Sequence, residues 1–112
     1  MIVQKIVKEI PDAYTLAFKY FSILSVVNDM NMVKRDVQLL SYAISENALI
    51  SDIKEDFVEK FNSSMPTVGN IISKLYKLKV LEKKKREVSI NKAHLLDFNN
   101  DLMLALKFLH KK

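Results

Sequence analysis

At 112 residues, 49% of them hydrophobic and 28% charged, the chain has the size and composition of one folded globular domain. A single Gly and two Pro argue against a sandwich or barrel of many hairpins, and the absence of Cys excludes disulfides, thiolate metal sites and a cysteine nucleophile. The net charge of +5 is concentrated in one segment, because residues 63–92 hold eight basic and two acidic side chains.

The first 31 residues predict a strand and a helix that precede the main unit. Residues 2–10 are rich in β-branched side chains and stop at Pro11, which favours a strand, although their apolar spacing also fits a helical stripe. Asp12 can then cap a helix over residues 13–28. This helix is apolar on nearly every side, so we expect it to need cover on several faces.

Two further helices are predicted in the middle of the chain. Asn31 can cap a helix that ends near Asn47, and residues 48–50 are consistent with a brief strand. Ser51 or Asp52 can cap the helix that follows. Its apolar positions repeat every four residues and therefore share one face: Ile53, Phe57 and Phe61.

A turn, a helix and a hairpin come next. Asn62 tolerates the left-handed conformation that ends helices, and Ser63 or Ser64 can cap a helix over residues 64–78 that has Pro66 in its first turn. Its core face consists of Val68, Ile71, Ile72, Leu75 and Leu78. Residues 80–84 and 87–90 then predict two short strands around Lys85 and Arg86, and residues 95–109 predict a strongly apolar helix or pair of helices.

Two helices joined by a short turn and followed at once by a hairpin resemble the winged helix-turn-helix superfamily, including its MarR-like and replication-initiator branches. The residues that carry the resemblance lie at 66–75, 78–83 and 88–91. Lys79 stands where these proteins usually have Gly, so either a residue with a Cβ adopts the left-handed conformation or the helix ends differently. The wing is also short and contains no Gly.

The resemblance implies a single domain that is mainly α with a small β hairpin (α+β), a winged helix-turn-helix with extra N- and C-terminal helices. Residues 32–92 would form the winged-helix unit, between an extension at 1–31 and a helix at 93–112. Winged-helix proteins commonly dimerise through helices outside the reading unit. We therefore expect a homodimer or a larger assembly that uses the helices at 13–28 and 95–109.

The resemblance further implies that the helix at 64–78 enters the major groove of duplex DNA while the wing at 80–91 contacts the DNA backbone. The side chains turned away from the core are polar or basic, and the densest basic run lies at the wing tip. The candidate DNA-binding residues are Ser64, Thr67, Asn70, Ser73, Lys74, Lys77, Lys83, Lys84, Lys85 and Arg86. Because only Arg35 and Arg86 are arginines, we expect modest direct readout of base sequence.

A protein partner remains an alternative to DNA, for example in a phage particle or another assembly. Four acidic residues on the helix before the candidate reading helix would repel phosphates if they face outward: Asp52, Glu55, Asp56 and Glu59. The basic face could equally be a solvated surface. Aromatic residues that could stack on bases are expected to be core or interface instead: Tyr14, Phe18, Tyr20 and Phe21.

The sequence contains no residue pattern that points to an enzyme, and neither a metal nor a cofactor is expected. His94 and Asp97 lie one helical turn apart, but two His without a Glu or Cys cluster do not make a metal site. The stretch at 16–27 is too short to span a bilayer, and residues 1–10 carry charges where a signal peptide is apolar. We expect a cytoplasmic protein of a bacterium, or a phage protein in the host cytoplasm or the virion.

Overall fold

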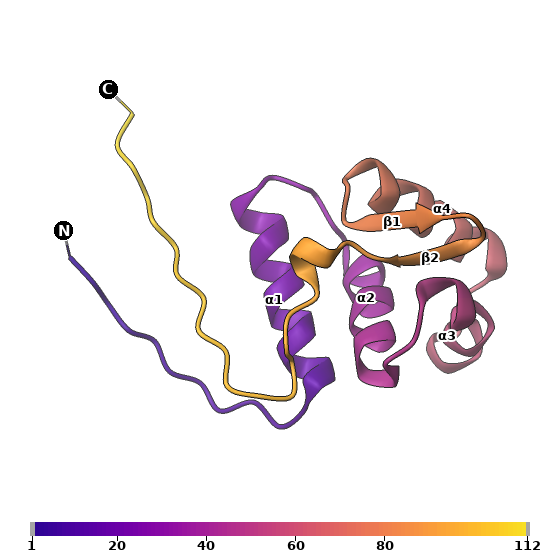
Figure 1. Ribbon diagram of the computed structural model, residues 1–112, viewed down its shortest axis with the longest axis horizontal. Coiled ribbons are helices and arrows are strands. Elements are labelled where there is room, and N and C mark those ends of the chain that lie inside the picture. The colour runs from indigo at the N-terminus through magenta and orange to yellow at the C-terminus, as the bar shows by residue number, and fades with distance from the viewer. Residues whose placement is uncertain (1, 112) are drawn as a thin grey trace.

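The computed structural model describes residues 2–111, which form four α-helices, two short 3-10 helices and one two-stranded antiparallel sheet (Figure 1). The elements in chain order are α1 (Ala13–Val27), α2 (Lys34–Glu46), η1 (Ile50–Asp52), α3 (Lys54–Phe61), α4 (Met65–Lys77), β1 (Leu81–Lys84), β2 (Glu87–Ile90) and η2 (Lys92–His94). The fold is therefore mainly α with a small β hairpin, as the sequence predicts. The order of α2, α3, α4 and the hairpin is consistent with a winged-helix-like arrangement.

One hydrophobic core joins these elements. Every element except η2 contributes at least one buried side chain, among them Phe21 of α1, Leu40 of α2, Phe57 of α3, Leu75 of α4 and Ile90 of β2. α1 packs mainly against α2, whereas α4 packs against α3 and β1. No helix in the described part of the chain is long and apolar enough to cross a membrane.

Four predicted helix ends are confirmed, and one that the sequence left open is decided. The side-chain oxygens of Asp12 and Ser64 each accept the backbone N–H of the residue three positions later, at 2.8 and 3.3 Å, as expected for N-caps. Asn47 and Asn62 end α2 and α3 in the left-handed conformation, with φ of 49° and 52°. Lys79 also adopts this conformation, with φ of 62°, so a lysine takes the place that glycine usually fills after the helix.

Two predicted caps are wrong. Asn31 has φ of 56° and lies before the start of α2, which follows Val33 instead. α3 follows Ile53, because Ser51 and Asp52 belong to η1. Neither α2 nor α3 has a side chain at the N-cap position that accepts a hydrogen bond.

The brief strand predicted at 48–50 is also wrong, because residues 48–49 have no regular secondary structure and Ile50 begins η1. The hydroxyl of Ser51 accepts the N–H of Val88 at 3.1 Å. Val88 pairs with Lys83 across the hairpin. A side-chain oxygen therefore satisfies a backbone donor of β2 that a third strand would otherwise bond.

The predicted N-terminal strand is wrong as well. Residues 2–10 have no regular secondary structure, and the side chains of Ile2, Val3, Ile6 and Val7 are exposed. The only sheet in the described residues is the hairpin, which lies beyond α2 from this segment (Figure 1). A strand here would have no partner for its backbone N–H and C=O groups.

The C-terminal helix predicted at 95–109 is absent, because residues 95–111 contain no helix. Local hydrogen bonds compete with helix formation: Asp97 accepts the N–H of Asn99 at 3.1 Å and the side-chain amide of Asn100 at 2.6 Å. Phe98 is buried against α1, where its ring lies 5.7 Å from that of Tyr20. The helix at 95–109 that the sequence predicts as part of a dimer or larger assembly is therefore not formed.

Candidate nucleic-acid interface

The side chains of α4 have four different surroundings: the core, the flank beside the hairpin, the outer face and the opposite flank. Those of Val68, Ile71 and Leu75 are buried in the core. On the flank beside the hairpin lie Met65, Gly69 and Ile72. The outer face exposes Asn70, Ser73 and Lys77, three of the residues that the sequence predicts for DNA contact.

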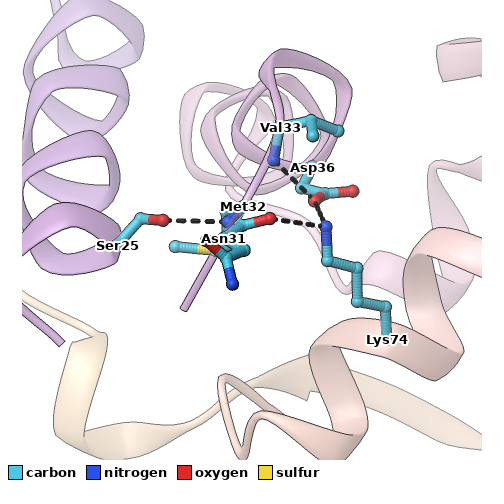
Figure 2. A network of polar contacts seen from close by, with 6 residues as sticks. All are labelled: Ser25, Asn31, Met32, Val33, Asp36 and Lys74. Atoms are coloured by element: carbon cyan, nitrogen blue, oxygen red, sulfur yellow. Dashed lines mark hydrogen bonds and ion pairs between the residues drawn. The ribbon is translucent and has the colours of Figure 1, made fainter. Parts of the chain in front are cut away.

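Lys74 lies on the opposite flank of α4, where it binds α2 and the preceding loop (Figure 2). Its Nζ donates to Oδ2 of Asp36 at 2.5 Å and to the carbonyl oxygen of Asn31 at 2.9 Å. Asp36 is buried, with 2% of its side chain exposed, and the same Oδ2 accepts the N–H of Val33 at 2.9 Å. The ammonium of this candidate DNA ligand is therefore held in a structural ion pair, the only one within residues 2–111.

The loop that precedes α2 is also bound to α1. The buried hydroxyl of Ser25 accepts the N–H of Met32 at 2.9 Å (Figure 2). Asp29 and Asn31 of this loop have φ of 52° and 56°. Three helices thus hold the loop, and neither Ser25 nor Asp36 is predicted from the sequence as a member of this network. An Asp at the third position of a helix is the available signal for Asp36, since its carboxylate can accept the N–H of the N-cap residue.

Ser64 and Thr67 lie at the start of α4, and both are exposed. Their hydroxyl oxygens are 2.8 Å apart, and Ser64 also accepts the backbone N–H of Thr67. These two predicted contact residues therefore form the cap of the helix. The Pro66 between them has no N–H to satisfy.

The hairpin separates the predicted basic cluster into two faces. Leu81 pairs with Ile90, and Lys83 pairs with Val88, so these four residues share the face that is turned toward the core. Lys84 lies on the opposite face with Glu82 and Glu87. The two-residue turn consists of Lys85, with φ of 59°, and Arg86.

An open groove of about 420 Å³ lies between α4 and the inner face of the hairpin. Its apolar lining comes from Met65, Ile72 and Val88, and its basic lining from Lys54, Lys83, Lys85 and Arg86. None of these basic side chains forms an ion pair with a residue in the described part of the chain. We call this site the wing groove. Lys54 is not predicted from the sequence as a site residue, because its position beside the hairpin depends on tertiary structure.

Arg86 is the arginine that is exposed on this surface. The other one, Arg35, is partly buried and donates from its guanidinium to the carbonyl oxygen of Phe61 at 2.6 Å. It therefore binds the C-terminal end of α3, where backbone carbonyls lack helical partners.

The outer side of α3 is acidic. Glu55, Asp56 and Glu59 are exposed, and Asp52 is exposed in η1. Burial raises the pKa of Tyr42, and the nearby carboxylates of Glu46, Asp56 and Glu59 raise it further. These acids therefore concentrate beside Tyr42, whose ring also lies 5.1 Å from the ammonium of Lys60.

The aromatic residues of α1 contribute to the core rather than to an open stacking surface. The hydroxyl of Tyr20 lies 3.0 Å from Nδ1 of His94, and Phe21 packs near the ring of Phe98. Burial lowers the pKa of His94 and raises that of Tyr20. Among the residues that the structure describes, no three His, Asp or Glu side chains gather where they could hold a metal ion.

The fold and this surface define a small, mainly helical protein with a winged-helix-like arrangement and a basic groove beside its hairpin. Comparisons with protein-family models, with curated proteins and with solved structures find no significant match. A function for this protein is therefore inferred from the geometry and charge of this surface.

Proposed function

We propose that the protein binds duplex DNA through the outer face of α4 and the wing groove, as a small regulator of transcription or replication. The observation that carries this proposal is the set of basic side chains that line the wing groove and have no acidic partner within residues 2–111, together with one exposed lysine on the outer face of α4. The groove residues are Lys54, Lys83, Lys85 and Arg86, and the lysine of the outer face is Lys77. Unpaired cations on one face are the electrostatic signature of phosphate binding.

The outer face of α4 supplies groups that suit base edges. Asn70 can bond an adenine edge through its amide, and Lys77 can bind a phosphate or a guanine. Lys74 is withdrawn from this surface by Asp36. With Arg86 as the one exposed arginine, most of the affinity is expected to come from phosphates, so discrimination between sequences should be modest.

A titration of fluorescent duplex DNA at several salt concentrations tests the proposal. Five phosphate contacts predict a slope of roughly −4.5 in log K against log salt, which is roughly a 500-fold loss between about 50 and 200 mM salt. Alanine at Lys83, Lys85 and Arg86 should weaken binding to all duplexes together and make the slope shallower by roughly 2.7. Absence of binding at low salt, or a flat salt response, contradicts the proposal.

The second candidate function is a structural or adaptor role, and the acidic outer side of α3 favours it. The side of the molecule that carries α1 also exposes apolar side chains, including Ile23 and Val26 on α1 and Met103 and Phe108 in the C-terminal segment. Size-exclusion chromatography with light scattering distinguishes the two roles. A stable monomer that binds DNA unaided argues against the adaptor.

A further inference from the structure

Gly69 is the only glycine of the chain, and nothing in the fold requires a glycine there. It lies in the middle of α4 with a helical rather than a left-handed backbone. Apart from the neighbouring residues and the backbone of α4 itself, no heavy atom of the described residues would lie within 4 Å of a Cβ at this position. Because glycine is among the least favourable residues in a helix interior, the position weakens α4 without a steric reason inside the protein.

Gly69 lies in the wing groove, on the same flank of α4 as Met65 and Ile72. Basic side chains from α3 and the hairpin line the same groove, namely Lys54 of α3 and Lys83, Lys85 and Arg86 of the hairpin. The missing side chain leaves the backbone of α4 accessible from the groove. A ligand of opposite charge can therefore approach α4 more closely here than at any position that carries a Cβ.

We propose that the wing groove holds the sugar-phosphate backbone of one strand of duplex DNA, with that strand in contact with α4 at Gly69. This proposal rests on the proposed function and specifies which part of the DNA the wing groove binds. The apolar side chains of Met65 and Ile72 match the deoxyribose, and the basic side chains match the phosphates. Charge complementarity selects a polyanion, and the open helix backbone accommodates a bulky one.

The pairing of the hairpin provides an internal comparison. Lys83 lines the groove, whereas its neighbour Lys84 lies on the opposite face beside Glu82 and Glu87. The phosphate charge of a DNA strand in the groove is therefore neutralised by Lys83 and not by Lys84. The two lysines are adjacent in sequence and both exposed, so they form a matched pair of test positions.

The first test measures the stability and DNA affinity of the full chain with Gly69→Ala and Gly69→Leu, beside Ser45→Ala in α2, an exposed helix position outside the proposed DNA-binding surface, as a control. Gly69→Ala is expected to raise the thermal midpoint by about 4 to 8 °C, because alanine favours the helix. The same change should weaken binding of duplex DNA about tenfold by displacing a charge-assisted contact, and Gly69→Leu should weaken it further. A Gly69 variant that is more stable but binds DNA more weakly shows that Gly69 serves DNA binding and not the stability of the fold.

The second test compares Lys83→Ala with Lys84→Ala in the same salt titration. Lys83→Ala should make the slope shallower by about 0.9, and Lys84→Ala should leave it unchanged. If the wild type binds DNA but the Gly69 variants bind as tightly, or if the two lysine variants behave alike, the groove assignment is overturned while the proposed function stands. If the wild type binds no duplex, both fail. Binding of polyglutamate that is as tight as that of DNA, or tighter, at the same salt concentration identifies an acidic peptide as the ligand and overturns the assignment of the groove to a DNA strand.

Discussion

Replacing Lys74 by Met is expected to lower the free energy of unfolding by about 2 kcal/mol, because it leaves the carboxylate of Asp36 without its cation. Removing one partner of a fully buried ion pair costs about 3 to 5 kcal/mol. Here the side chain of Asp36 is 2% exposed but that of Lys74 is 37% exposed, so water can reach part of the vacated site. The N–H of Val33 also remains as a donor to the same oxygen, at 2.9 Å. Both features reduce the loss.

Urea denaturation followed by circular dichroism measures this effect, and Lys77→Met is the matched control. Lys77 is exposed on the same helix and forms no ion pair in the described residues, so its replacement should change stability by less than about 0.5 kcal/mol. A double-mutant cycle with Asp36→Asn should give a coupling of about 1 to 2 kcal/mol between the two side chains. Equal stability of the two methionine variants, or a coupling near zero, refutes the structural role of Lys74.

DNA affinity should show the reverse order. Lys77→Met removes a cation from the outer face of α4, whereas Lys74→Met removes one that Asp36 already neutralises. Under conditions where both variants are folded, the affinity loss is therefore expected to be larger for Lys77→Met. A larger loss for Lys74→Met would mean that the ion pair opens when DNA binds.

Three further changes test the local chemistry of the fold. Ser64→Ala removes the cap of α4 and should lower the free energy of unfolding by about 1 kcal/mol in urea; unchanged stability would contradict the cap. Lys79→Gly removes the backbone strain of a lysine in the left-handed conformation and should raise the free energy of unfolding by about 1 kcal/mol. A loss of stability would contradict the presence of this strain. Burial lowers the pKa of His94 from 6.5, so unfolding takes up a proton and stability should fall as pH drops below that value; His94→Gln should reduce this fall in thermal scans, and an unchanged pH profile would contradict it.

Local chemistry made several parts of the fold predictable from the sequence. A cap such as Ser64 and a left-handed residue such as Asn62 act over three or four neighbours, so the sequence is sufficient to locate them. The hairpin at 81–90 followed from strand patterning around two charged turn residues. The exposed positions of α4 followed from its helical period, which correctly places Asn70 and Lys77 outside the core.

Longer-range features could not be predicted in this way. The orientation of Lys74 depends on Asp36, which lies 38 residues away in sequence, and the inner position of Lys83 depends on the register of the hairpin. Apolar spacing at 95–109 indicates a need for burial but does not say which surface will provide it. In that segment Asp97 instead forms a local turn, which is a common alternative to a helix for this residue type.

Three positions around the hairpin carry residue types that the local backbone disfavours. Within residues 2–111, four of the six non-glycine residues with positive φ are Asn or Asp, which tolerate that conformation, and the other two are Lys79 and Lys85, on either side of β1. The only glycine, which would suit either position, lies instead in the interior of α4 at Gly69. Glycine at the two lysine positions and alanine at Gly69 would each favour the fold. Residues that contradict local preference are expected where a surface serves binding, and Lys85 and Gly69 both line the wing groove.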